Sequence, residues 1–145
     1  MSSKGDYYIM NDIELLRILS KKARDSKSDI KMYQSYCHSI AIHFILSTEI
    51  FTSNEKLEGF LINNTLFQSL LNNNNTEFRP YLYKSRTQVV GRLIRLIDES
   101  EKESLDLFLK MIRELVFHKP SSSNSNSKSE KNYFDSIIEQ LYGEE

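Results

Sequence analysis

Cysteine is almost absent from this sequence: Cys37 is the only one among 145 residues. A single thiol cannot form an intramolecular disulfide, and scarce cysteine is typical of a reducing compartment. Residues 1–8 lack the apolar core of a signal peptide, and every apolar run is much shorter than a membrane span. We therefore expect an intracellular protein, nuclear or cytoplasmic, that has no membrane partner.

Glycine is scarce as well, and neither sign of charge is in large excess. The four glycines stand alone, so there is no glycine-rich phosphate loop, and the motifs G-x-S-x-G and H-E-x-x-H do not occur. The formal net charge of −1 gives no overall field that would attract nucleic acid. These absences predict a protein that is not an enzyme and that binds no cofactor.

Cys37, His38 and His43 are the one group in the sequence with the chemistry of metal ligands. On a helix, His38 and His43 would lie about 140° apart, so they would not share a face. Zinc needs three or four ligands, and Cys37 falls on an apolar stripe. The sequence therefore predicts no metal site, and a packed core thiol at Cys37.

Apolar residues at helical spacing are abundant, and residues 29–50 show them most clearly. The stripe comprises Ile30, Tyr33, Cys37, Ile40, Ala41, Phe44 and Ile45. Ile42 and Leu46 lie off this stripe, so the second half of the segment is apolar most of the way round. A helix that is apolar on most sides is buried on most sides. We therefore predict a central helix here, with the other helices packed around it.

Helical periodicity continues along most of the chain, and no strand pattern persists. Further helices are predicted over residues 8–24, 52–63, 66–71, 80–98 and 100–116, two of them opened by capping boxes at 52–55 and 100–103. Capped helices joined by short breaks predict an all-α fold, a compact bundle of about six or seven helices around the buried central helix. A short stack of helical hairpins is the alternative.

Two specific expectations concern the predicted helices 80–98 and 100–116. The connection between residues 80–98 and 100–116 is short, which predicts an antiparallel helical hairpin. Gly91 interrupts the first helix of this pair, and a close contact with another helix would explain a glycine there.

Composition divides the chain into three regions. Residues 1–118 contain the predicted helical domain. Residues 119–131 have no aliphatic or aromatic side chain and are rich in serine and asparagine, which predicts a flexible linker. Residues 132–145 are predicted to form a short amphipathic helix, and we expect it to dock on the same domain or on a partner, because a helix of this length needs a groove to stay helical.

A surplus of large apolar side chains provides the evidence for a function. Apolar surface that a domain cannot bury itself marks a site for a partner. The candidate partner-binding residues are Phe60, Phe67, Leu70, Leu71, Phe134, Ile137, Ile138 and Leu141. We therefore predict a non-catalytic helical protein–protein interaction module, a subunit or adaptor of a larger complex, whose partner is another protein or a second copy of itself.

Nucleic-acid binding is one alternative. The segment 80–98 and the residues just before it carry a run of cations with tyrosines near its start, and such a stripe could follow a phosphate backbone. The candidate residues are Arg79, Lys84, Arg86, Arg92 and Arg95. The acidic start of the next helix would offset this charge.

The last residues suggest a second alternative. Tyr133-Phe134-Asp135, taken with Leu141-Tyr142-Gly143-Glu144, resembles the C-terminal helix of some poxviral Bcl-2-like inhibitors. This resemblance implies an inhibitor with a long central helix and a groove that accepts an amphipathic peptide. It is confined to these residues and transfers no upstream functional residue to this chain.

Overall fold

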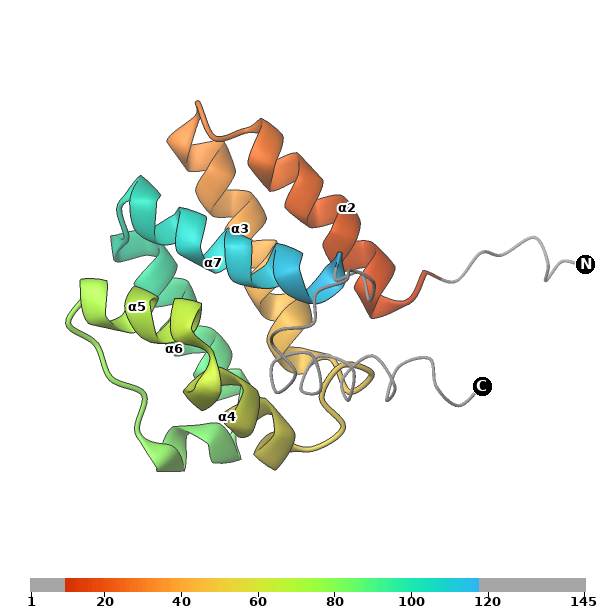
Figure 1. Ribbon diagram of the computed structural model, residues 1–145, viewed down its shortest axis with the longest axis vertical. Helices are drawn as coiled ribbons and strands as arrows, with labels where there is room; N and C mark the ends of the chain where they lie inside the picture. The colour runs from red at the N-terminus through yellow and green to blue at the C-terminus, as the bar shows by residue number, and fades with distance from the viewer. Residues whose placement is uncertain (1–9, 118–145) are drawn as a thin grey trace, which may run out of the picture.

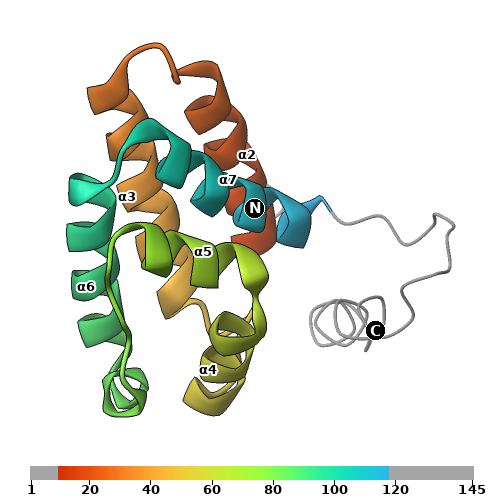
Figure 2. The same ribbon diagram turned by 60° about the vertical axis from the view of Figure 1, so that its left-hand side comes forward.

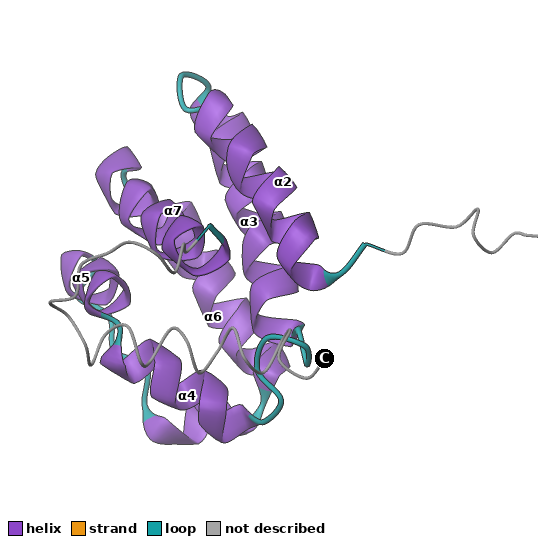
Figure 3. Ribbon diagram, turned by 45° about the vertical axis from the view of Figure 1, so that its right-hand side comes forward, coloured by secondary structure: helices purple, strands orange, loops and turns teal. Residues whose placement is uncertain are grey.

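Helices and loops make up the whole of residues 10–117, the part of the chain that the computed structural model describes (Figures 1 and 3). The elements are α2 (Asp12–Asp25), α3 (Ile30–Leu46), α4 (Asn54–Asn63), α5 (Thr65–Asn73), the 3-10 helix η1 (Pro80–Lys84), α6 (Arg86–Glu99) and α7 (Lys102–Val116). No strand occurs within this range, so the predicted all-α bundle is confirmed. The predicted linker 119–131 and helix 132–145 lie outside the described residues.

The central helix of the bundle is α3, as predicted, but it is buried on fewer sides than expected. Helices α2, α6 and α7 pack against it, and Figure 2 shows α2 and α6 on either side of it. Tyr33, Cys37 and Phe44 on the predicted stripe are fully buried, whereas Ile30 at its start is 43% exposed. Ile42 and Leu46, however, are 36% and 42% exposed, because no helix within residues 10–117 covers the side of α3 between α2 and α6. The expectation of burial on most sides was therefore wrong.

Side-chain caps fix where most of the helices begin. Asn11, Asp29, Ser53, Asn64 and Ser85 each accept a hydrogen bond from the backbone N–H three residues later. Such a cap satisfies one of the N–H groups that a helix start leaves unpaired. The first helix therefore begins at residue 12 rather than 8, and the cap of α4 is Ser53 rather than the predicted Thr52.

The second predicted capping box is not used. Ser100 closes α6 instead of opening α7, and its hydroxyl donates to the Leu96 carbonyl at 2.6 Å. The residue before α7 is Glu101, whose side chain makes no capping hydrogen bond. The two helices also do not form the predicted hairpin: α6 packs on α3, whereas α7 packs on α5 and α2, and the two run in different directions (Figure 2).

The predicted helix over residues 80–98 is in fact two elements. Ser85 has an extended backbone, with φ −132° and ψ 111°, and its hydroxyl caps α6. The preceding turn is the 3-10 helix η1, which buries Leu82 and Tyr83. The Ser85 hydroxyl accepts from the backbone N–H of Gln88, so the chain can change direction there while one of the otherwise unpaired N–H groups of α6 is satisfied.

Gly91 does not make the close helix contact that was expected. It is exposed, and a Cβ atom added to it would meet nothing within 4 Å. We therefore expect Gly91→Ala to raise the free energy of unfolding by about 0.5–1 kcal/mol, because alanine loses less backbone entropy in a helix. Urea denaturation measures this change. Gly59→Ala in α4, where the space is equally open, should act in the same direction, and a destabilised Gly91→Ala protein would contradict the prediction.

Candidate partner surface

Half of the predicted partner-binding residues lie in the core. Phe60, Phe67 and Leu70 have no exposed surface, and Leu71 is 4% exposed. The ring of Phe60 lies 5.3 Å from that of Phe51 and 5.9 Å from that of Phe44. In this structure these four side chains pack the bundle and present no surface to a partner. The other four predicted residues, Phe134, Ile137, Ile138 and Leu141, lie outside the described part.

A different set of side chains, three of them exposed and apolar, forms the candidate partner surface. They project from the uncovered side of α3 at positions spaced three and four residues apart, and we call them the outer α3 face. The set is Met32, Ser35, Ser39, Ile42 and Leu46. Met32 is 47% exposed, and Ile42 and Leu46 are exposed to a similar degree. The apolar periodicity of the sequence predicts burial of Ile42 and Leu46, and the structure instead exposes both side chains.

The outer α3 face carries no formal charge. Between Lys31 and Glu49 the sequence contains no aspartate, glutamate, lysine or arginine, and His38 and His43 are the only histidines. A solvent-facing helix surface normally carries charged residues opposite its apolar stripe. Depletion of charge together with exposed aliphatic side chains is typical of the centre of a protein–protein interface. This helix therefore has the composition of an interface on its exposed side.

The C-terminal end of α3 is held in place by Arg86 at the start of α6. Its guanidinium donates to the carbonyls of Ile45 at 3.1 Å, Ser47 at 3.0 Å and Phe51 at 2.6 Å, and to Asn54 Oδ1 at 2.8 Å. These carbonyls belong to the last turn of α3 and the loop after it, where helix carbonyls have no intrahelical partner. The sequence had suggested that Arg86 contacts nucleic acid, but here it closes a helix end.

Polar contacts tie the rest of α3 to the neighbouring helices. Tyr33 donates to Asp106 of α7 at 2.5 Å, and His38 Nε2 lies 2.7 Å from Asp98 of α6. Burial, followed by the hydrogen bond to Asp106, raises the pKa of Tyr33 far above its usual range, so its hydroxyl remains a donor. The helix is therefore fixed at both ends, and its outer face is presented on a rigid element.

Cys37 lies on the opposite, buried side of α3. Burial raises the pKa of its thiol from 9.0 to about 12, with a smaller contribution from Asp106. A protonated, inaccessible thiol is a poor nucleophile. Among the described residues, no group of three or more histidine, cysteine, aspartate or glutamate side chains could hold a metal ion.

The raised pKa of Cys37 has a measurable consequence. We expect iodoacetamide to label this thiol much more slowly in the folded protein than in urea at the same alkaline pH, as followed by mass spectrometry. Because the native thiol keeps its proton while the unfolded thiol loses it, its contribution to stability should fall as the pH rises from about 9 towards 12. Equal labelling rates in the folded and unfolded states would contradict the prediction.

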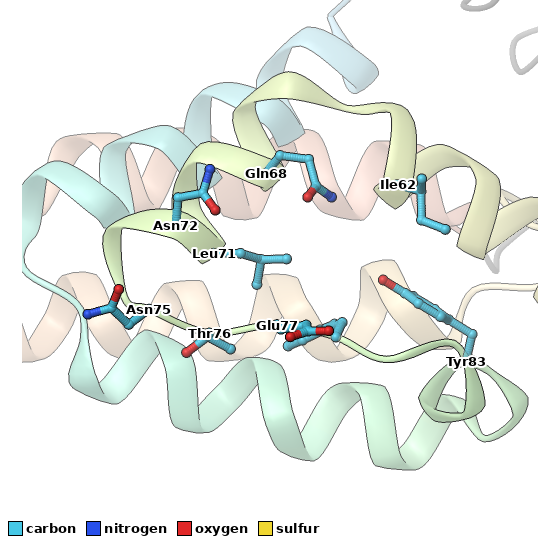
Figure 4. Close-up of a pocket in the computed structure, with 9 residues that line it drawn as sticks. Ile62, Gln68, Leu71, Asn72, Asn75, Thr76, Glu77 and Tyr83 are labelled. Atoms are coloured by element: carbon cyan, nitrogen blue, oxygen red, sulfur yellow. The ribbon is translucent and has the colours of Figure 1, made fainter.

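A groove of about 470 Å³ lies between α4, α5 and the segment that leads into η1 (Figure 4). Its walls are Ile62, Gln68, Leu71, Asn72, Asn75, Thr76, Glu77, Phe78 and Tyr83. Figure 4 shows the Tyr83 hydroxyl and several amide groups around the opening. Burial and the nearby Glu58 raise the pKa of Tyr83 to about 12. This largely polar lining suits a hydrogen-bonding ligand better than the apolar face of an amphipathic helix.

The predicted nucleic-acid residues do not form one stripe. Arg79 and Lys84 lie at the two ends of η1, Arg92 and Arg95 are exposed on α6, and Arg86 is engaged by the carbonyls described above. The break at Ser85 separates the two groups of cations. Residues 79–95 therefore do not form the single basic helix that the nucleic-acid alternative requires.

Comparison with known proteins gives no family to which the chain can be assigned. No family model matches it, and neither a curated protein nor a solved structure is significantly similar to it. Within residues 10–117, no helix combines the length and the apolar character that crossing a membrane requires.

Proposed function

We propose that this protein is a non-catalytic helical interaction module, a subunit or adaptor that binds another protein or a second copy of itself through the outer α3 face. The observation that carries this proposal is an exposed helix side with three apolar residues, Met32, Ile42 and Leu46, and no formal charge from Met32 to Thr48. Leaving Met32, Ile42 and Leu46 in water costs free energy in proportion to their apolar area, and a partner that covers them recovers it.

The anchoring of α3 also supports this proposal. Arg86 holds its C-terminal end, and Tyr33 and His38 attach it to α7 and α6. A face that is already ordered loses little conformational entropy when a partner binds. The face therefore combines exposed apolar area with a low cost of association.

The two alternatives have less support. A nucleic-acid-binding subunit would use Arg79, Lys84, Arg92 and Arg95, but these residues are divided between two elements. A Bcl-2-like groove-binding inhibitor would need an apolar cleft, whereas the groove beside α5 is lined largely by amide, hydroxyl and carboxylate groups. No contact among the described residues favours either function over a protein partner on α3.

Site-specific photo-crosslinking tests the proposal. A benzoylphenylalanine placed at Ser35, on the outer α3 face, is expected to form covalent adducts with a protein in the cells that express this chain. The same residue placed at Ser69, which is exposed on α5, is the matched control and should give no such adduct. If both positions give the same adducts, or if neither gives any, the outer α3 face is not a partner site.

A further inference from the structure

The residues of the outer α3 face follow a regular spacing along the helix. Its five residues are separated by three, four, three and four positions, which is the spacing of the a and d positions of a coiled coil, although two of the five are serines. Two small residues, Ser35 and Ser39, lie in the middle, and larger residues lie towards the ends, at Met32, Ile42 and Leu46. Small central residues allow two helix backbones to approach closely.

We infer that the partner at this face is a second copy of this chain, with the two α3 helices packed antiparallel across a twofold axis at Ser39. This inference rests on the proposed function, since it names the partner of the same face. Antiparallel pairing about Ser39 places Met32 opposite Leu46 of the second copy, and it brings Ile42 next to Ser35 of the second copy. The isoleucine near the axis then packs beside a serine, whereas Met32 and Leu46 pack against each other at the two ends of the interface.

The charge distribution favours self-association of this kind. A twofold interface places a residue on the axis next to its own copy, so any formal charge close to the axis would face the same charge. The outer α3 face has none. The flanking charges differ in sign, with Lys31 before the face and Glu49 after it. Antiparallel pairing brings Lys31 near Glu49 of the second copy, and it also opposes the two helix dipoles.

Disulfide trapping in the full-length chain tests the register directly. Ser39→Cys is expected to form a covalent dimer under mild oxidation, because the two thiols would meet at the axis within the short Cα separation that a disulfide allows. The native thiol gives little background, since Cys37 is fully buried. Ser35→Cys lies off the axis and should not link to itself, and Ser69→Cys on α5 controls for random collision.

Analytical ultracentrifugation provides the second measurement. The wild-type protein is expected to dimerise reversibly at micromolar concentrations, and Ile42→Asp should weaken the dimer at least about tenfold by placing a charge in the apolar seam. Ile62→Asp is the matched control, since Ile62 is 48% exposed on α4 and away from this face. Circular dichroism of both variants checks that the helices remain folded.

The possible outcomes separate this inference from the proposed function. A dimer that Ile42→Asp weakens, together with self-linking at Ser39 and not at Ser35, supports the antiparallel pair. A wild-type monomer at all concentrations, or equal linking at Ser39 and Ser69, overturns it. In that case an adduct from Ser35 to a different protein would still support the proposed function, and the absence of any adduct would remove both.

Discussion

Replacing Arg86 with alanine is expected to lower the free energy of unfolding by about 3 kcal/mol. The guanidinium donates to three main-chain carbonyls and to the Asn54 side chain, and alanine would remove all four hydrogen bonds at a partly buried site, although the Ser47 carbonyl would still accept from the backbone N–H of Phe51. The change would also remove a positive charge from the C-terminal end of α3, where the helix dipole favours cations. Urea denaturation followed by circular dichroism measures the loss.

Two variants show whether the hydrogen bonds of Arg86 are the cause. Arg86→Lys keeps the charge but cannot reproduce the planar set of donors, so it should recover only part of the stability. Arg92→Ala removes an exposed arginine from the same helix and should change the free energy of unfolding by less than about 0.5 kcal/mol. If Arg86→Ala and Arg92→Ala have equal effects on the free energy of unfolding, the hydrogen bonds from Arg86 to the end of α3 contribute nothing to stability.

Replacing Phe44 with alanine is expected to lower the free energy of unfolding by about 4 kcal/mol, the largest effect predicted here. Phe44 is fully buried on α3, and its ring lies 5.4 Å from Phe51 and 5.9 Å from Phe60 in edge-to-face arrangements. Alanine would leave a cavity between α3, the loop that follows it and α4, and it would also remove the aromatic contacts. Thermal and urea denaturation both report this loss.

The matched control for Phe44 is an exposed isoleucine. Ile18→Ala on α2 removes a side chain that is 41% exposed and should change stability by less than about 0.5 kcal/mol. Phe44→Leu keeps most of the apolar volume and should lose clearly less than Phe44→Ala. A Phe44→Ala protein as stable as the wild type would show that the aromatic cluster is not packed as described.

The local features of the chain could be predicted from its sequence because they depend on nearby residues. The apolar stripe of α3 and the cap at Asp29 follow from side chains within a few positions of one another. The break between α4 and α5 was also predicted, and Asn64 both ends one helix and caps the next. The sequence placed the starts of the helices less accurately, because residues close to Ser53 and Ser85 have side chains that could cap a helix equally well.

The candidate surface could not be predicted in the same way. Ile42 and Phe60 are both apolar residues at helical spacing, yet one is exposed and the other is in the core. Periodicity identifies which residues share a helix side, but it does not show which side a neighbouring helix covers. Arg86 looked like any surface arginine, because the carbonyls that it binds are more than thirty residues away in sequence.

The sequence alone therefore determined that this chain is helical, where most of its helices lie and which stripe of α3 faces the core, because spacing and caps act over a few residues. Only the tertiary structure decided that α6 packs on α3 rather than on α7, that Phe60 and Leu70 are core residues, and that Ile42 and Leu46 face solvent. The physical reason is that burial depends on which distant helices meet, and the packing of the whole bundle sets that arrangement.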